Sequence, residues 1–279
     1  MAISNFIPIV WSDKIFQAND KAKIFASLAN REYEGEIADK GDQVKITELG
    51  AITTGAYSGT VTYQELDDAS KFLVVDQDYY GAFNNKDLDK VQANVALLGE
   101  ATRKLGEALA DDEDQNIAGL YTEAGINDGS TISVTAITSA NVISTISDMN
   151  VSFDTNNVPQ DNRVMVVPPW FIQKLYLAKV IRDTDNSDVL GNGYMGKIDG
   201  WEVYMSNNVV HSSTTWYAPM FFRAGDTIAH ANQLTTVESL RLEGSFGDGV
   251  RGRMVYGSKV VRPSSLGVVY CSQGSETAI

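Results

Sequence analysis

The side chains that most often carry out catalysis or bind metals are scarce in this chain. Its 279 residues include two histidines, His211 and His230, and one cysteine, Cys271. A zinc site or a Cys/His nucleophile system needs several such residues close together. His211 lies in a Ser/Thr-rich turn segment, and His230 alternates with Ile228 in a strand-like pattern. We therefore expect both histidines to be structural or exposed, and one cysteine excludes an intrachain disulfide.

Two glycine-rich stretches, 191–196 and 247–252, match the spacing of phosphate-binding loops. A phosphate cradle needs a strand before the motif and a helix N-terminus after it, where backbone N–H groups converge. The first stretch follows a polar loop, and the runs that follow the two stretches, 201–205 and 253–256, are strand-like. We interpret both stretches as turns.

Acidic residues form two clusters that are weak candidates for cation sites. The residues 111–114 are consecutive, and consecutive helix side chains point around the cylinder, which favours a solvated face. Asp183, Asp185 and Asp188 resemble part of a calcium loop, but Asp188 and Tyr194 stand where such a loop needs Gly and Glu. We expect no metal, no cofactor and no catalytic residue, and therefore no enzyme.

Composition narrows the function classes further. The net charge of −14 argues against a nucleic-acid grip, which needs clustered Lys and Arg, although an acidic surface can lie beside DNA without sticking to it. No apolar run approaches the roughly 20 residues that span a bilayer. The N-terminus lacks the basic residues and apolar core of a secretion signal.

The N-terminal part of the chain is predicted to form two extended arms. Residues 1–42 are unusually apolar for a terminus, and they must pack either on their own domain or on a neighbouring subunit. Residues 43–78 alternate as an extended β-hairpin, with strand-like runs at 44–47 and 71–75. The tip between Gly50 and Ser70 holds few large aliphatic side chains, so we expect a projecting arm rather than a compact subdomain.

A long helix is predicted over 86–121. Asn84 and Asn85 are the expected N-caps, and Gly125 is expected to end the element. At 1.5 Å per residue this helix would be about 54 Å long, against a diameter of roughly 48 Å for a compact globule of this chain length. Such a helix indicates the spine of an elongated or flat protein. Its apolar stripe consists of Leu88, Val91, Val95, Leu98, Thr102, Leu105 and Leu109.

Mixed α/β structure is predicted after the helix. Thr138 and Ser139 are expected to cap a helix through Met149, and the apolar run 163–167 fits a buried strand. A second helix is expected to start at Pro168-Pro169 and to reach about Ile181. Strands are expected at 198–206, 216–223, 227–234, 236–243, 250–262 and 266–271.

The order of these elements, together with several local motifs, resembles the major capsid proteins of tailed bacteriophages, which have the Hong Kong ninety-seven fold. The likeness covers nearly the whole chain. Two motifs in the N-terminal part carry it: FIPIVWS at 6–12 together with ANREYEGEI at 29–37, and DKGDQVKI at 39–46. Two more lie further along the chain: residues 158–159 together with 163–169, and FGDGVRG at 246–252 together with residues 256–257. The resemblance implies an α+β fold with an N-terminal arm at 1–42, an E-loop hairpin at 43–78, a P-domain spine helix at 79–124, an A-domain at 125–235, and returning strands shared by both domains at 236–279.

The resemblance also implies a function. Hexamers and pentamers would form an icosahedral shell around double-stranded DNA, bound without sequence specificity, in a virion assembled in the host cytoplasm. The implied partners are further copies of the chain, a scaffolding protein and a portal, with a decoration protein as a further candidate. Because the arm motif begins at Phe6, we expect a separate scaffolding protein rather than a cleaved leader. Because the tip between Gly50 and Ser70 contains no lysine, we expect no covalent crosslink.

Three alternatives stay open at this point: an encapsulin-like nanocompartment shell, an acidic enzyme that acts through carboxylates, and a phage tail, neck or adhesion component. For a shell protein, aromatic and apolar groups on the arms and arginines able to pair with carboxylates are the expected contact residues. The candidates for intersubunit contact are Phe6, Ile7, Trp11, Phe16, Arg31, Glu34, Tyr57, Tyr63, Arg251 and Arg253.

Overall fold

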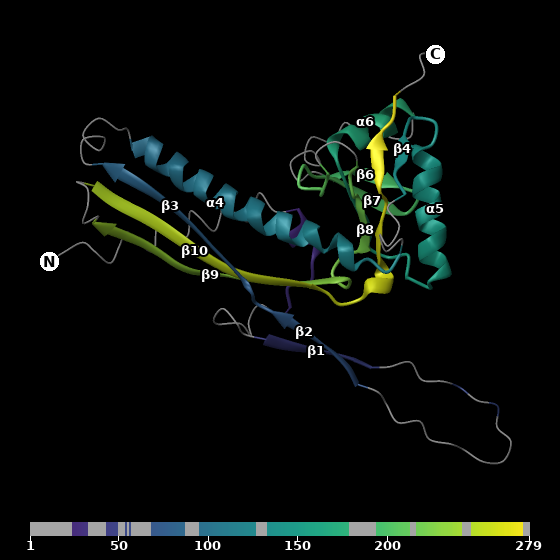
Figure 1. Cartoon of the computed structure of the whole chain (residues 1–279), viewed down its shortest axis with the longest axis horizontal. Helices are drawn as coiled ribbons and strands as arrows, with labels where there is room; N and C mark the ends of the chain where they lie inside the picture. The colour runs from purple at the N-terminus through teal and green to yellow at the C-terminus, as the bar shows by residue number, and fades with distance from the viewer. Residues whose placement is uncertain are drawn as a thin grey trace.

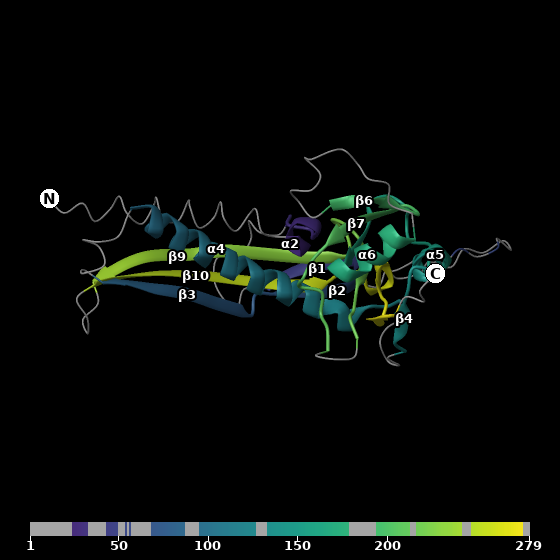
Figure 2. The same ribbon diagram turned by 90° about the horizontal axis from the view of Figure 1, so that it is seen from above.

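The molecule has two parts and a projecting hairpin. Figure 1 shows a long helix lying along a narrow sheet, a mixed α/β module at one end of it, and a hairpin that extends away from both. Seen from above in Figure 2, the long part is thin. The computed structural model describes residues 24–32, 43–49, 54, 56, 68–86, 95–126, 133–178, 194–212, 216–241 and 247–275.

The elements follow one another in an α+β order, as expected. The helices are α2 (Phe25–Leu28), α4 (Val95–Ala118), α5 (Val142–Thr155) and α6 (Pro169–Leu177), with 3-10 helices η2 (Gly119–Glu123) and η4 (Pro263–Ser265). The strands are β1 (Gln43–Leu49), β2 (Asp68–Val74), β3 (Gln77–Lys86), β4 (Thr135–Ile137), β5 (Arg163–Val167), β6 (Tyr194–Ile198), β7 (Trp201–Met205), β8 (Met220–Arg223), β9 (Ile228–Arg241), β10 (Gly247–Val260), β11 (Leu266–Val268) and β12 (Cys271–Gln273). They form sheets with the orders β1-β2, β3-β10-β9, β11-β8-β5-β7-β6 and β12-β4.

The long module consists of α4 packed on one face of the sheet β3-β10-β9. A Cβ atom at Gly81 would lie 2.0 Å from Cδ1 of Leu105, so the glycine lets the helix approach the strand closely. Tyr79 stacks on Tyr256 with 5.7 Å between ring centroids. The apolar side chains between helix and sheet are Phe83, Leu105, Leu109, Val250, Met254 and Tyr256.

The predicted start of the long helix was wrong. Asn84 and Asn85 do not cap it; they lie in β3, where they pair with Gly249 and Asp248 of β10. Asparagine favours helix caps, but the ladder to β10, which is distant in the sequence, decides their conformation. Residues 87–94 lie outside the described residues. The described helix has 24 residues, about 36 Å at the usual rise, and η2 extends it to Glu123, near the predicted end.

The late strands of the sheet are longer than predicted. The predicted strands 227–234 and 236–243 are one continuous strand, β9. The register against β10 shifts between Arg253 and Met254, which pair with Thr236 and Leu234. A bulge thus takes up one extra residue and keeps the strand continuous.

The mixed module contains the buried strand β5, and the prediction of a fully buried run at 163–167 is confirmed. Helix α5 starts at Val142 with Asn141 at its N-cap position, rather than being capped by Thr138 or Ser139, and it continues past Met149 to Thr155. The reason for the later start is a turn in which the Oδ1 atom of Asn141 accepts a hydrogen bond from Thr138 N at 2.7 Å. Helix α6 begins at Pro169, as predicted.

A buried arginine is central to the mixed module. The Arg163 side chain is 1% exposed, and its guanidinium carbon lies 5.6 Å from the ring centroids of both Phe153 and Trp201. These two rings meet edge to face at 4.8 Å. The cation is therefore held between two aromatic faces, which favours a charge that has left water.

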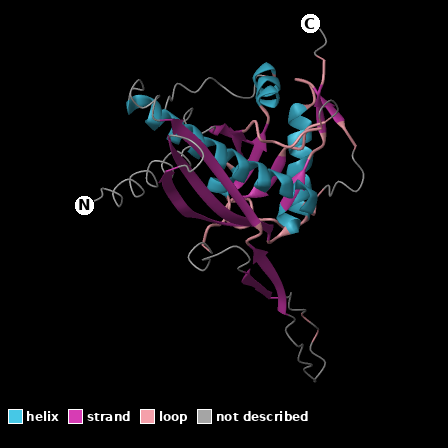
Figure 3. Ribbon diagram, turned by 60° about the vertical axis from the view of Figure 1, so that its left-hand side comes forward, coloured by secondary structure: helices cyan, strands magenta, loops and turns pink. Residues whose placement is uncertain are grey.

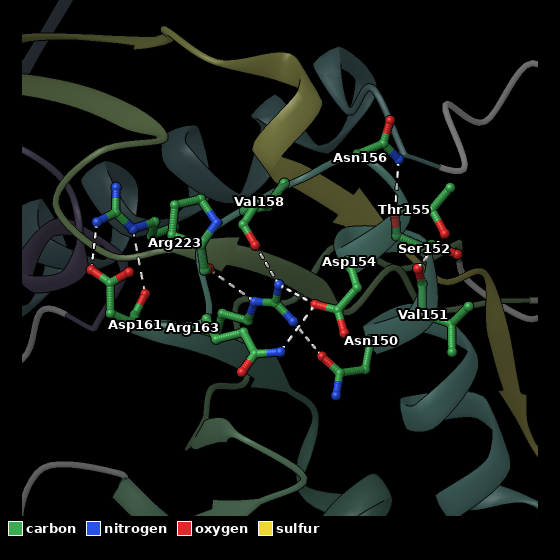
Figure 4. Close-up of polar contacts among 12 residues, drawn as sticks. Asn150, Val151, Ser152, Asp154, Thr155, Asn156, Val158, Asp161, Arg163 and Arg223 are labelled. Atoms are coloured by element: carbon green, nitrogen blue, oxygen red, sulfur yellow. Dashed lines mark hydrogen bonds and ion pairs between the residues drawn. The ribbon is translucent and has the colours of Figure 1, made fainter.

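Hydrogen bonds satisfy the donors of this guanidinium, as Figure 4 shows. Nε donates to the carbonyl oxygen of Pro159 at 3.1 Å, and Nη1 donates to Oδ1 of Asn150. Nη2 donates to Oδ1 of Asp154 at 2.7 Å and to the carbonyl oxygen of Val158 at 2.5 Å. The hydrogen bond from Arg163 also holds the pKa of the Asp154 carboxyl below its usual value. The arginine thus fixes the loop between α5 and β5.

We expect Arg163→Met to lower the free energy of unfolding of the mixed module by about 3–5 kcal/mol, because it leaves buried acceptors without donors. Chemical denaturation followed by tryptophan fluorescence measures the loss. The matched control is Arg223→Met, nearby in Figure 4, which removes partly exposed ion pairs to Asp161 and Asp226 and should cost about 1 kcal/mol or less. Equal losses in the two variants would contradict the structural role given to Arg163.

Candidate assembly surfaces

Helix α4 covers only one face of the long sheet, and the other is here called the open sheet face. Successive strand side chains point to opposite faces. Since Val250 and Met254 face α4, their neighbours Arg251 and Arg253 face away. The residues that line a concave surface of about 610 Å³ on the open sheet face are Asp78, Tyr80, Ala82, Glu238, Arg251, Gly252 and Arg253.

Two cross-strand ion pairs organise this surface. Arg253 makes a bidentate contact with Asp78, from Nε to Oδ1 at 2.8 Å and from Nη2 to Oδ2 at 2.7 Å. Arg251 donates from Nε to Oε2 of Glu238 at 2.8 Å, and its Nη2 contacts the same oxygen. All four side chains remain partly exposed, so each pair stabilises the fold by only about 0–1 kcal/mol. Arginines 251 and 253 therefore pair with carboxylates within their own chain, and their contact with a neighbour stays a prediction.

Apolar groups accompany the ion pairs. Tyr80 is 79% exposed and Leu240 is 46% exposed. A second concave surface of about 270 Å³ shares Ala82 and Arg251 with the first, so the two form one continuous trough. Exposed tyrosine side chains are typical of interface centres.

The base of the hairpin covers one end of the same sheet face. Strands β1 and β2 pair antiparallel, which confirms the predicted hairpin at its base. One hairpin face buries Val44, Ile46, Leu73 and Val75 against Ala229, Ala231 and Val255. The other exposes Phe72 and Val74. Figure 3 shows this arm extending beyond the rest of the molecule.

Among the remaining contact candidates, the structure describes Arg31. Its Nη2 atom donates to Oδ1 of Asn232 in the same chain at 3.5 Å, and its pairing with a neighbouring subunit stays a prediction. The other candidates lie outside the described residues, and their contacts stay predictions: Phe6, Ile7, Trp11, Phe16, Glu34, Tyr57 and Tyr63.

The acidic run at 111–114 contradicts the prediction of a solvated face. Glu113 and Asp114 are 0% and 2% exposed, whereas Asp111 is exposed. Oε1 of Glu113 lies 2.5 Å from Nε2 of His230, which is also fully buried. Sequence reasoning missed this cluster because its members are 117 positions apart along the chain. The alternation of His230 with Ile228 in a strand-like pattern was the one signal in the sequence for a structural histidine.

The other chemically suggestive motifs have structural explanations. The stretch 247–252 is not a turn: it lies in β10, bonded to strands on both sides, so its N–H groups are engaged in the ladder. In the stretch 191–196, residues from Tyr194 lie in β6, and 191–193 fall outside the described residues. His211 is exposed and stacks on Tyr217. Burial raises the pKa of the Cys271 thiol to about 12, which makes it unreactive.

Metal coordination finds no support in the part of the chain that the structure describes, since no three His, Cys, Asp or Glu side chains there could hold an ion together. The candidate calcium residues 183, 185 and 188 lie outside it.

Comparisons with known proteins all point to one architecture. A family model described as "Phage capsid protein" matches residues 77–269. A structure titled "Mycobacterium phage Che8" is 28% identical in sequence to this chain, with a TM-score of 0.72. The match covers 88% of this chain and 90% of that chain. The capsid structure of Cyanophage P-SCSP1u is 17% identical over 91% of this chain and 89% of that chain, with a TM-score of 0.66.

A virus-like particle from Pyrococcus furiosus is 11% identical over 95% of this chain and 99% of that chain, with a TM-score of 0.58. At such identities, the cyanophage and Pyrococcus structures show a shared fold alone. No curated protein matches the chain.

We expect Gly257→Ala to loosen the hairpin. A Cβ atom at Gly257 would lie 2.3 Å from the carbonyl oxygen of Val74 and 2.9 Å from Cα of Val75, so β2 would have to move away from β10. Such a shift should lower the free energy of unfolding by about 1–3 kcal/mol and speed protease cleavage in β1 and β2.

The control is Gly119→Ala, where an added Cβ meets nothing within 4 Å. It should leave both stability and cleavage close to wild type. Unchanged cleavage in Gly257→Ala would show that the hairpin does not depend on this close approach.

Proposed function

The chain belongs to the phage capsid protein family and has the Hong Kong ninety-seven capsid fold, and on that premise we propose that it is the major capsid protein of a tailed double-stranded DNA phage. Its copies would form the hexamers and pentamers of an icosahedral shell. The observation that carries this proposal is an elongated subunit with a half-covered sheet and a hairpin that leaves the molecule from beneath that sheet.

The geometry suggests how copies would join. The hairpin base exposes Phe72 and Val74, and the open sheet face exposes Tyr80 and Leu240. These are two different surfaces of the chain: the hairpin base packs its other face on one end of the sheet, and the stretch with Tyr80 and Leu240 is left open. A head-to-tail contact between them is heterologous, and such contacts close into rings when the rotation permits. We propose that Arg251 and Arg253, with the aromatic residues of the hairpin, take part in it.

The remaining roles follow from the same proposal. A separate scaffolding protein and a portal would take part in assembly in the host cytoplasm, with a decoration protein as a further candidate. The mature shell would enclose DNA without reading its sequence, in keeping with a net charge of −14. Within the described chain, every helix falls short of the length and apolarity that a bilayer crossing needs. We also propose the arm, hairpin, spine and A-domain boundaries given above as the working division of the subunit.

The second candidate is an encapsulin-like compartment, which the fold shared with the Pyrococcus particle favours. The higher identity to the structure from phage Che8 favours the phage capsid. The contents of shells purified from the native source distinguish the two, since a phage head holds DNA and a compartment holds protein cargo.

We expect replacement of Gly50 to Ser70 by a short turn to leave a folded subunit that no longer forms shells.

We expect Tyr80→Ser to weaken assembly as well, because it removes an exposed aromatic side chain from the open sheet face. Sedimentation velocity and negative-stain microscopy measure assembly, and circular dichroism measures folding.

Tyr176→Ser on α6 is the matched control, since Tyr176 is also exposed but lies outside the long module. It should assemble normally. Normal shells from the hairpin deletion would show that the arm does not join subunits.

A further inference from the structure

The first described segment, residues 24–32, docks where α4 meets the edge of the long sheet. Phe25 and Ala26 of α2 are buried in a core cluster with Ile117 and Ala118 of α4. This contact joins two parts of the chain that are far apart in sequence.

The segment then continues along the edge of β9. Asn30 forms a parallel bridge with Ala229. Asn30 N donates to the carbonyl oxygen of Ile228 at 2.8 Å, and His230 N donates to the carbonyl oxygen of Asn30 at 2.9 Å. Residues 24–31 are therefore a strap laid across the helix and onto the sheet edge.

A carboxylate of the spine helix holds the start of the strap. Helix α2 has no side-chain cap of its own. Oδ2 of Asp114 accepts a hydrogen bond from Ile24 N at 3.1 Å, and Oδ1 accepts one from Ala26 N at 3.4 Å. The strap in turn helps to exclude water from this carboxylate, because Asp114 is almost fully buried.

The next residue links the strap to the sheet. Oε1 of Glu113 lies 2.5 Å from Nε2 of His230 and accepts a hydrogen bond from Nδ2 of Asn232 at 2.5 Å. Nη2 of Arg31 in the strap donates a hydrogen bond to Oδ1 of the same Asn232 side chain. Nδ1 of His230 lies 2.9 Å from Oγ of Ser258 on β10. Strap, helix and both strands thus share one buried polar cluster.

Several charged and titratable groups lie on the elements around this cluster. Helix α2 contributes none between residues 25 and 28, and Lys259 of β10 is paired with Glu123 at 2.7 Å. The described groups nearest to the cluster along these elements are Arg31 and Glu32 after α2, Asp111, Asp112, Glu113 and Asp114 on α4, Tyr121 and Glu123 on η2, His230 on β9, and Tyr256 and Lys259 on β10. Tyr79 of β3 and Asp76 before it lie near Tyr256.

We propose that Asp114, beside the buried Glu113–His230 pair, is a proton-sensitive latch that tightens the strap onto the spine helix in acid and loosens it as the pH rises. This inference concerns the subunit itself and does not depend on the proposed shell. Two adjacent buried carboxylates are costly when both are ionised, and the strap is the part that can move to relieve that cost.

The direction of the pH dependence follows from the pKa of the Asp114 carboxyl with the strap docked and with the strap released. Burial raises the pKa of docked Asp114 from 3.8 to about 6, the hydrogen bonds from the strap backbone oppose the rise, and the charge of Glu113 adds to it. With the strap released, water reaches the carboxyl and its pKa returns toward 3.8. The docked state therefore binds the proton more tightly, so docking strengthens as the pH falls through 6 and levels off below 4. Between pH 7.5 and 5.0 the docking constant should rise about tenfold.

Hydrogen exchange on the full-length chain tests the latch. Protection of the amides in 25–31, corrected for the intrinsic exchange rate, should rise about tenfold in wild type between pH 7.5 and 5.0. Asp114→Asn keeps one oxygen that can accept a hydrogen bond from the strap but has no proton to gain, so its protection should be independent of pH. Asp111→Asn, an exposed neighbour on the same helix, should keep the wild-type pH dependence.

Peptides from β5 report global folding in every sample. Asp114→Ser provides a second uncharged acceptor, should the asparagine variant lose protection in β5. The proposal is overturned if these uncharged variants keep the wild-type pH dependence, or if wild-type protection of the strap falls on acidification.

Discussion

A single helix can bury only one face of a three-stranded sheet, and the other face must be covered by something else or remain in water. The long module illustrates this constraint. Helix α4 packs Leu105 and Leu109 against β10, and Gly81 allows it to lie close to the strands. The hairpin base then covers one end of the opposite face, and the end that carries Tyr80 stays open. An elongated subunit built in this way has a small core of its own and gains from a neighbour that completes it.

The second module supplies a firm attachment for this long sheet. The chain crosses between the modules at several adjoining points, and backbone bonds join them. Gly125 N donates to the carbonyl oxygen of Pro263 at 2.8 Å, and Val261 N donates to that of Thr227 at 2.9 Å. Gly125 lies so close to Pro263 that an added Cβ would be 2.5 Å from its oxygen.

Sequence patterns predicted the elements whose cause is local. The apolar run 163–167 and the alternation in the hairpin strands are such cases, and both elements form where expected. The resemblance to phage capsid proteins rested on the order of elements and is confirmed by the family match.

Elements determined by distant partners could not be predicted in this way. Asn84 was expected to cap a helix because asparagine often does so, but its ladder partner lies in β10. The glycines at 247–252 suggested turns, whereas Gly252 pairs with Gly81 across the sheet beneath α4. Glu113 and Asp114 looked solvated, because the groups that pair with them come from α2 and β9. The contact candidates on the arm and at the hairpin tip remain predictions.

The central claim is that the open sheet face is completed by a second copy of the chain. Cryo-electron microscopy of particles assembled from the full-length protein tests it directly. The account predicts closed shells in which the hairpin of one subunit lies over Tyr80 and Arg251 of the next. Shells in which that face is exposed to solvent, or a protein that stays monomeric with its scaffolding protein present, would contradict it.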